Sequence, residues 1–280
     1  MSTPSVRELF VNAVAELRGL GGETPEAEAR LLLAETCGMS PVDAAFAERS
    51  ATEAEVAAFR EFLRRRAGRE PAQYILGKAY FYDLELEVSP AVLIPRPETE
   101  LLVDRMIETL PQGGRLLDLG TGSGAIALAV ARHRPDARVT GIDISADALE
   151  IAKRNARKVG AKNVEFVLSD LFSSLDGERF DAVAANLPYV PEEDRPLLAP
   201  EVALREPATA LFARDGGLAV INRALAALPE HVSPGGRAIF ELDPRQAAVV
   251  SEKLAALGFS SAIRCDLTGR ERFVEGVAAL

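Results

Sequence analysis

An amide, a proline and an aromatic ring follow the apolar run FDAVAA at residues 180–185. Because the residue before a proline is pushed into extended backbone geometry, Pro188 fixes the direction of the Leu187 carbonyl. That carbonyl and the side-chain oxygen of Asn186 can converge as two hydrogen-bond acceptors, and Tyr189 adds a flat ring. This set suits a planar –NH₂ group. The alternative is an ordinary turn, but the position at the end of a predicted buried strand favours a binding site.

A glycine-rich loop follows an earlier apolar strand, in the sequence LLDLGTGSGAIALAVA at residues 116–131. Its spacing is G-x-G-x-G, whereas dinucleotide-binding loops read G-x-G-x-x-G and hold a pyrophosphate at the helix N-terminus. Asp118 would place negative charge near that pyrophosphate, which argues against NAD. The loop therefore favours a cationic ligand without phosphate, S-adenosylmethionine. The expected cofactor-binding residues of the loop are Asp118, Gly120, Thr121, Gly122, Ser123 and Gly124.

Two further acids stand at predicted strand ends. Asp143, in GIDIS, lies about twenty residues beyond the glycines, where an acid can accept hydrogen bonds from both ribose hydroxyls. Its alternative role is to cap the next helix, for which Ser145 is the nearer candidate. Asp170 precedes the apolar Leu171 and Phe172, a combination that suits the amine and the faces of adenine. The alternative for Asp170 is a common turn aspartate.

Strands and helices alternate from residue 97 onward. Strands are expected at 115–119, 138–142, 164–168, 180–185 and 236–242, with a final pair within 259–278. Helices are expected at 97–110, 123–133, 146–159, 215–230 and 244–257. This order indicates an α/β fold with a mostly parallel sheet, helices on both faces and an antiparallel edge. Because open α/β sheets bind ligands beyond the carboxyl ends of their strands, the site residues should meet there.

The first part of the chain is predicted to be a small helical bundle of about 75 residues. Capping boxes at Ser5-Glu8 and Thr52-Glu55 open the first and fourth helices, and Thr24-Pro25 and Ser40-Pro41 open the second and third. Alternating apolar and acidic residues in AYFYDLELEVSPAVLIP then predict a two-stranded hairpin. The expected domains are a helical domain at 1–76, a hairpin linker at 77–95 and an α/β domain at 96–280, and the resemblance described below implies substrate docking for the first and catalysis for the last.

Composition narrows the class of protein. The chain has 280 residues, 48% of them hydrophobic, and a formal net charge of −10 with a pI near 5.0, so nucleic acid is a disfavoured partner. Two cysteines, Cys37 and Cys265, indicate no disulfide framework. With no signal pattern and no apolar run near ~20 residues, we expect a soluble cytoplasmic protein without membrane contact. No metal site is expected.

The run FREFLRRRAGR gathers five arginines with a single acid, Glu61. The simpler interpretation is a solvated helix face with carboxylate partners elsewhere in the chain. The alternative is a docking surface for an acidic protein. The arginines are Arg60, Arg64, Arg65, Arg66 and Arg69.

The chain resembles the release factor glutamine methyltransferases, the HemK/PrmC family, from about residue 70 to its end. The matching stretches are EPAQYILG, VLIPRPETELLVD, LLDLGTGSGAIALA, GIDIS, FDAVAANLPYVP, PEVALREPATAL and DLTGRERFVEG. The resemblance implies a helical bundle, a hairpin linker and a seven-stranded Rossmann-like domain. It also implies methyl transfer from S-adenosylmethionine to the glutamine amide of the Gly-Gly-Gln motif in peptide chain release factors, gripped between the domains.

The resemblance also implies roles for single residues. Gly120–Gly124 would bind the methionine portion of the cofactor, Asp143 its ribose, and Asp170 with Leu171 its adenine. The glutamine amide would be bound by Asn186, Leu187, Pro188 and Tyr189, with Asn186, Pro188 and Tyr189 as catalytic residues and Asn186 also near the cofactor.

This chain departs from the family pattern at three places. Leu187 stands where most members have proline, Ala213-Arg214 replaces a glycine pair, and ELDPRQ replaces Glu-Ile-Gly before a variable pair and Gln. The leucine leaves a nucleic-acid adenine methyltransferase open as an alternative. A ribosomal-protein glutamine methyltransferase and a cofactor-binding protein without catalysis are the others.

The expected chemistry requires no dedicated base. An amide nitrogen is a poor nucleophile, and two acceptors on its N–H bonds direct electron density onto it. The methylated, still-protonated amide is a strong acid, so water can take its proton. We therefore expect solvated structural roles for His133 and His231.

Overall fold

The computed structural model describes residues 3–21 and 24–280, so the predictions for Met1, Ser2, Gly22 and Glu23 lie outside it. The chain divides into two compact units. The first unit comprises Met1–Gly77 and Ala199–Arg205, and the second comprises Lys78–Leu198 and Glu206–Leu280. The hairpin is grouped with the second unit, and the division into three functional domains stays a prediction.

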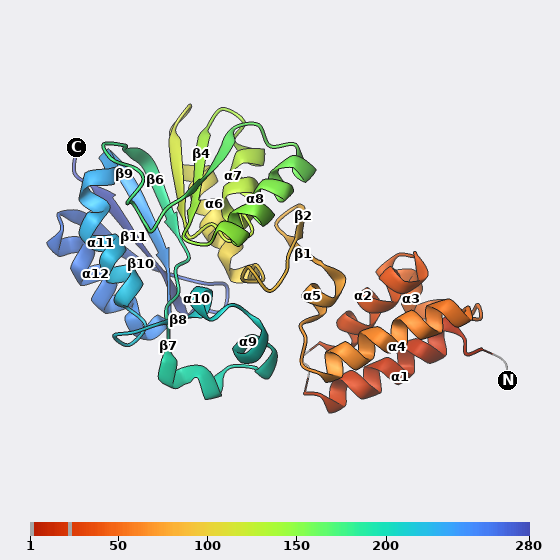
Figure 1. Cartoon of the computed structure of the whole chain (residues 1–280). Coiled ribbons are helices and arrows are strands. Elements are labelled where there is room, and N and C mark those ends of the chain that lie inside the picture. The colour runs from red at the N-terminus through yellow and green to blue at the C-terminus, as the bar shows by residue number, and fades with distance from the viewer. Residues whose placement is uncertain (1–2, 22–23) are drawn as a thin grey trace. The chain divides into compact units, whose positions relative to one another are not determined.

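The first unit is helical, as expected. Both predicted capping boxes are confirmed, since Ser5 and Glu8 bond reciprocally at the first helix and Thr52 and Glu55 do so at the fourth. Apolar side chains from these helices form a core of their own, with Leu32 and Phe59 almost fully buried. Its helices are α1 (Val6–Gly19), α2 (Pro25–Cys37), α3 (Pro41–Phe46), α4 (Glu53–Ala67), α5 (Ala72–Leu76) and α9 (Pro200–Arg205) (Figure 1).

The arginine run carries its own carboxylate partners. Arg64 pairs with Glu61 and Arg65 with Glu70, at 2.6 and 2.5 Å. Arg66 is buried and pairs with Glu28 and Glu201, and Arg69 donates to the Leu20 carbonyl. These contacts favour the helix face with carboxylate partners, but Arg66 is buried, so the expectation that the whole face is solvated was wrong at this residue.

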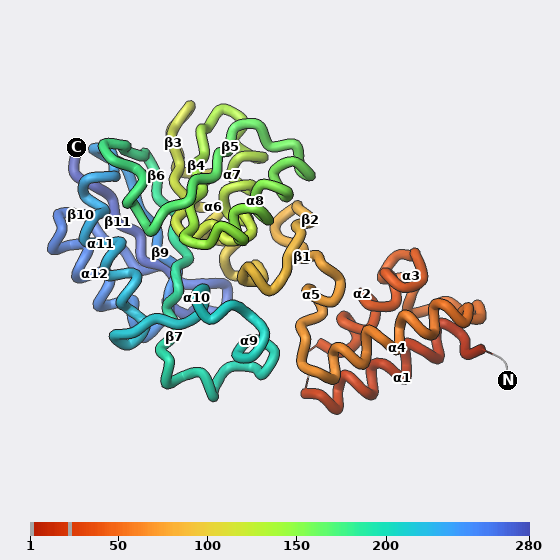
Figure 2. Tube along the Cα trace, in the orientation of Figure 1, coloured from red at the N-terminus to blue at the C-terminus, as the bar shows by residue number. Residues whose placement is uncertain are grey.

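The second unit contains the predicted α/β sheet. The seven strands lie in the order β10-β11-β9-β6-β3-β4-β5, and the five from β9 to β5 are parallel. β11 pairs antiparallel with both β9 and β10, which makes the expected antiparallel edge. The strands are β3 (Arg115–Leu119), β4 (Arg138–Asp143), β5 (Val164–Leu168), β6 (Phe180–Ala185), β9 (Val232–Glu241), β10 (Phe259–Cys265) and β11 (Glu271–Ala278) (Figure 2).

Helices cover both faces of this sheet, and each face has its own apolar core. One core includes side chains of α6, α7 and α8, and the other includes those of α11 and α12. The hairpin of β1 (Lys78–Phe81) and β2 (Leu84–Glu87) adds Phe81 and Leu86 to the first core. The helices are η1 (Pro97–Thr99), α6 (Glu100–Thr109), α7 (Ala125–His133), α8 (Ala146–Val159), α11 (Ala219–His231), η3 (Pro244–Gln246) and α12 (Ala247–Ala256).

The largest differences from expectation lie in residues 190–235. The helix expected from residue 215 begins at Ala219, because Asp215, Gly216 and Gly217 have positive φ angles that no helix accepts. The strand expected from 236 already begins at Val232. The unassigned stretch 190–213 contains β7 (Val190–Pro191), η2 (Glu192–Leu197), α9, α10 (Ala208–Leu211) and β8 (Phe212–Ala213). In residues 3–21 and 24–280, no helix is long and apolar enough to cross a membrane.

Candidate active site

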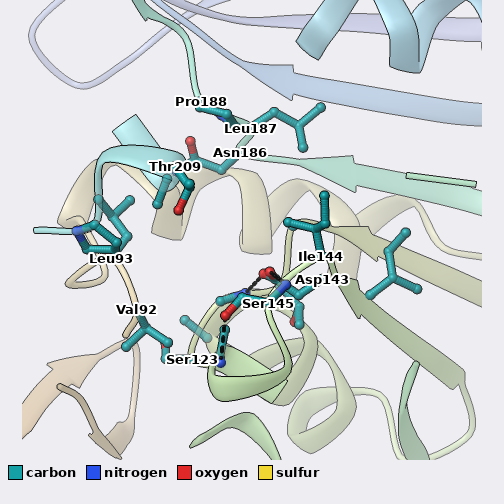
Figure 3. A pocket seen from close by; sticks show the side chains of 18 of the residues that line it. Val92, Leu93, Ser123, Asp143, Ile144, Ser145, Asn186, Leu187, Pro188 and Thr209 are labelled. Carbon is teal, nitrogen blue, oxygen red and sulfur yellow. Dashed lines mark hydrogen bonds between the residues drawn. The ribbon is translucent and has the colours of Figure 1, made fainter. Parts of the chain in front are cut away.

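A cavity of about 360 Å³ opens at the carboxyl ends of β3, β4 and β6. Its volume lies in the range of small-molecule sites. In Figure 3, Asn186, Leu187, Pro188 and Thr209 lie on one side of the cavity, opposite Asp143 and the residues beside it. The predicted site residues on the cavity wall are Gly120, Thr121, Gly122, Ser123, Asp143, Asp170, Leu171, Asn186, Leu187 and Pro188.

Asp118 lies beneath the glycine loop rather than on the cavity wall. Its carboxyl group is fully buried, and its Oδ2 accepts from Thr121 Oγ1 at 2.7 Å and from the Ala127 N–H at 3.1 Å. Its Oδ1 has no partner among the described residues. Burial raises the pKa of Asp118 to about 7. The structure thus shows Asp118 shaping the loop, and its expected contact with a cofactor stays a prediction.

The three glycines of the loop, Gly120, Gly122 and Gly124, all have positive φ angles. Their surroundings differ. A Cβ at Gly124 would lie 3.1–3.3 Å from Leu128, Phe166 and Ala152, so close helix packing requires this glycine, which lies off the cavity wall. A Cβ at Gly122 would meet nothing nearer than 4.0 Å. The main chain at Gly122 is therefore open to a ligand.

Asp143 joins the loop to the next helix. Its Oδ2 accepts from the Gly122 N–H and its Oδ1 from the Ser145 N–H, both at 2.9 Å. Ser145, as expected, caps α8 by accepting from the Ala148 N–H. Burial raises the pKa of Asp143. Because each carboxylate oxygen has further lone pairs, Asp143 can still accept hydrogen bonds from a ligand in the cavity.

Asp170 shares the cavity wall with a partner that the sequence reasoning missed. Arg223 of α11 donates through Nη2 to Asp170 Oδ2 at 2.7 Å. Both side chains are partly exposed. One carboxylate oxygen of Asp170 thus remains for another donor.

Asn186 is held by two buried groups that no motif pointed out. Its Nδ2 donates to Thr99 Oγ1 at 3.1 Å, and Thr99 Oγ1 donates to Glu241 Oε2 at 2.7 Å. Thr99 is 4% exposed and Glu241 is 2% exposed. Since Nδ2 is engaged, Asn186 Oδ1 remains as a free acceptor beside the cavity. Thr99 lies in the family stretch IPRPETE, and Glu241 lies in ELDPRQ. Neither residue was given a role from the sequence.

The three residues after Asn186 have different surroundings. Leu187 is 4% exposed and packs in the apolar core, while Pro188 lines the cavity. Tyr189 lies off the cavity wall, where its ring packs against the core and burial raises its pKa to about 12. Its carbonyl accepts from Gln246 Nε2 at 2.9 Å. Stacking of Tyr189 on an amide therefore stays a prediction.

The stretch 91–99 forms another part of the wall, and a buried acid fixes it. Glu206 accepts from the Ile94 N–H at 3.2 Å and pairs with Arg96 at 2.6 Å. Its side chain is 1% exposed. The motifs IPRPETE and PEVALREPATAL, which lie more than a hundred residues apart, are thus joined at the cavity.

Comparison with known proteins identifies the family. The model described as a methyltransferase domain matches residues 110–249, and that of the PrmC N-terminal domain matches residues 8–77. A release factor glutamine methyltransferase of Deinococcus radiodurans is 38% identical over 275 residues, which cover 96% of this chain and 97% of the relative. One of Escherichia coli is 37% identical over 267 residues, covering 94% and 95%. The chain belongs to the release factor glutamine methyltransferases.

A solved structure agrees with this family on the fold. A methyltransferase from Pyrococcus furiosus matches with a TM-score of 0.56 and 21% identity, covering 77% of this chain and 99% of that chain. This likeness supports the sheet and its flanking helices as a methyltransferase fold.

Neither histidine of this methyltransferase lines the cavity. His133 Nε2 lies 3.1 Å from Asp83 Oδ1 at the partly exposed end of α7. The expectation of a solvated His231 was wrong. His231 is buried, stacks on Phe172 at 4.4 Å and bonds through Nδ1 with the Glu178 carbonyl, because α11 brings it under the loop before β6.

Proposed function

We propose that this enzyme transfers a methyl group from S-adenosylmethionine to the side-chain amide nitrogen of the glutamine in the Gly-Gly-Gln motif of peptide chain release factors. The single observation that carries the proposal is the hydrogen bond from Asn186 Nδ2 to Thr99, which leaves Asn186 Oδ1 as an acceptor. Together with the Leu187 carbonyl it provides acceptors for the two N–H bonds of a primary amide. The names of the relatives give the same substrate.

The residues around the cavity fit the cofactor. When bound, S-adenosylmethionine supplies an electrophilic methyl group on its sulfonium. The main chain at Gly122 is open to the ligand, and Asp143 has lone pairs for the ribose hydroxyls. Asp170 and Leu171 lie on the same wall for the adenine.

Asn186 and Leu187 act on the glutamine by accepting hydrogen bonds from its amide and by holding it in place. Asn186 Oδ1 and the Leu187 carbonyl each accept one amide hydrogen, which directs electron density onto the nitrogen. Holding the nitrogen in line with the methyl group removes much of the entropic barrier. The methylated, still-protonated amide is a strong acid, so its proton can leave to water without a dedicated base.

The release factor is the proposed protein partner, and the helical unit is its proposed docking domain. Release factors act on ribosomes, so the enzyme would meet its substrate in the cytoplasm. Incubation with labelled cofactor and purified release factor, followed by peptide mass mapping, tests the assignment. A methyl group on the Gly-Gly-Gln glutamine supports it. Methylation of a ribosomal protein or of adenine in nucleic acid, with none on the release factor, would overturn it.

The first prediction concerns cofactor binding. S-adenosylmethionine should bind and NAD should not, and Asp143→Ala should weaken binding by about 1–3 kcal/mol through lost hydrogen bonds to a charged group. Isothermal calorimetry measures both. Asp147→Ala is the matched control, because Asp147 is exposed in the first turn of α8 and lies off the cavity wall. Tight NAD binding without S-adenosylmethionine binding would contradict the cofactor assignment.

The second prediction concerns the leucine that replaces the usual proline. Leu187→Pro should keep most of the activity, since proline retains the carbonyl and suits the backbone that Pro188 already imposes. No backbone hydrogen bond from the Leu187 N–H occurs among the described turns and loops, so its loss costs little. Turnover on the release factor measures the result. A loss as large as that of Asn186→Ala would show a differently built pocket.

A further inference from the structure

Three polar side chains form a line from the sheet to the cavity, and each comes from a different part of the chain. Glu241 ends β9, Thr99 ends η1, and Asn186 follows β6. The oxygen of Thr99 lies 2.7 Å from Glu241 and 3.1 Å from the amide nitrogen of Asn186. Of the three, only Asn186 and Thr99 line the cavity. Glu241 is therefore linked to the cavity through its hydrogen bond with Thr99.

The charge of Glu241 sets the direction of these hydrogen bonds. An ionised carboxylate can only accept hydrogen bonds, so the Thr99 hydroxyl must donate its one hydrogen to Glu241. The Thr99 oxygen is then left as an acceptor, and the amide of Asn186 must turn its Nδ2 toward it. This orientation leaves Asn186 Oδ1 for the substrate. If the amide were rotated by half a turn, Asn186 Oδ1 would face the Thr99 oxygen. Both atoms would then be acceptors, and the hydrogen bond would be lost.

We infer that Thr99 and Glu241 are positioning residues, which hold the side-chain amide of Asn186 with its oxygen toward the substrate nitrogen. The inference rests on the proposed function, because it assigns Asn186 Oδ1 as an acceptor for the glutamine amide. It goes further in naming the two groups outside the Asn-Leu-Pro-Tyr stretch that make this acceptor available.

The surroundings of Glu241 make its charge dependent on pH. Burial raises its pKa to about 7, and Glu98 acts in the same direction, whereas Arg272, Arg96 and the bond from Thr99 oppose it. Tyr189 faces the same group. Protonated Glu241 can donate to Thr99, which frees the Thr99 hydrogen and permits the flipped amide. Since the carboxylate is the active form, methyl transfer should rise as the pH increases through about 7.

The direct test removes the Thr99 hydroxyl while keeping its volume. Thr99→Val should lower kcat about 10- to 100-fold, with cofactor affinity and KM for the release factor nearly unchanged. Thr99→Ser keeps the hydroxyl and should restore most of kcat. Thr109→Val is the matched control, because the Thr109 hydroxyl bonds only the Arg105 carbonyl in α6. Equal kcat values for the valine and serine variants at position 99 would overturn the inference.

Two further measurements separate positioning from a general loss of structure. In an Asn186→Ala background, Thr99→Val should have no added effect on kcat, because the group that it positions is gone. Losses that multiply in the double variant would contradict the inference. Glu241→Gln cannot ionise, so it should lose the rise of kcat with pH. A rise near pH 7 that persists in Glu241→Gln would also contradict it.

A spectroscopic measurement tests the orientation without any methyl acceptor. The side-chain NH₂ signals of Asn186, assigned by their absence in Asn186→Ala, should show slow hydrogen exchange in the wild type and faster exchange in Thr99→Val. Equally fast exchange in both proteins would overturn the inference. If the wild type fails to methylate the release factor but shows this difference, the proposed function falls and the positioning of Asn186 stands.

Discussion

Replacing Asn186 with alanine is expected to lower the rate of methyl transfer roughly 10²- to 10³-fold, the scale for losing one positioned polar group in a transition state. The variant loses Oδ1, which the bond from Nδ2 to Thr99 leaves available for the substrate amide. One N–H bond of the glutamine then has no acceptor, and the nitrogen lone pair stays delocalised into the carbonyl. The residues proposed to bind the cofactor, Gly122, Asp143 and Asp170, are unchanged in this variant, so cofactor affinity should stay nearly the same.

The measurement is single-turnover methylation of the release factor at saturating cofactor, beside calorimetry for cofactor binding. Asn222→Ala is the matched control, because Asn222 lies in α11, bonds Lys253 and is absent from the cavity wall. It should leave the rate unchanged. Near-wild-type turnover by Asn186→Ala would refute the role given to Asn186, whereas parallel losses of rate and cofactor affinity would show that it mainly holds the cofactor.

The sheet could be predicted because its strands are local features of the sequence. Parallel strands read as short, largely apolar runs, and those at 115–119, 164–168 and 180–185 were confirmed to the residue. Knowing the strand ends was enough to expect that Gly120, Asp143 and Asn186 would meet. The structure places all three around the same cavity.

The partners of these residues could not be predicted, because they depend on contacts between distant segments. Thr99 and Glu241 are 142 residues apart and meet only after β9 is placed in the sheet. Arg223 reaches Asp170 from a helix 53 residues further along the chain. Asp118 was expected at the ligand from its place near the end of a strand, but its bonds with Thr121 and the Ala127 N–H form only when the loop and α7 fold over it. Side-chain direction at a strand end is decided by such bonds.

The helical unit and the second unit have separate apolar cores. Among the residues that the structure describes, the buried core of the helical unit ends at Ile75, and the two cores of the second unit begin at Phe81. The described part of the cavity wall also begins at Phe81. A protein that begins at Lys78 therefore retains every group that shapes the proposed cofactor site. What it lacks is the proposed docking domain.

Removing Met1–Gly77 is accordingly expected to leave cofactor affinity nearly unchanged and to lower kcat/KM on the intact release factor at least ~100-fold, which corresponds to losing about 3 kcal/mol of docking energy. A short peptide carrying Gly-Gly-Gln makes few contacts outside the cavity, so both proteins should methylate it at similar, low rates. Calorimetry first verifies that the shortened protein binds the cofactor, which shows that its sheet is folded. Competition kinetics on the intact release factor and on the peptide then give the two kcat/KM ratios. Equal losses on both substrates would place the defect in the active site, and no loss on either would mean that the helical unit does not bind the release factor.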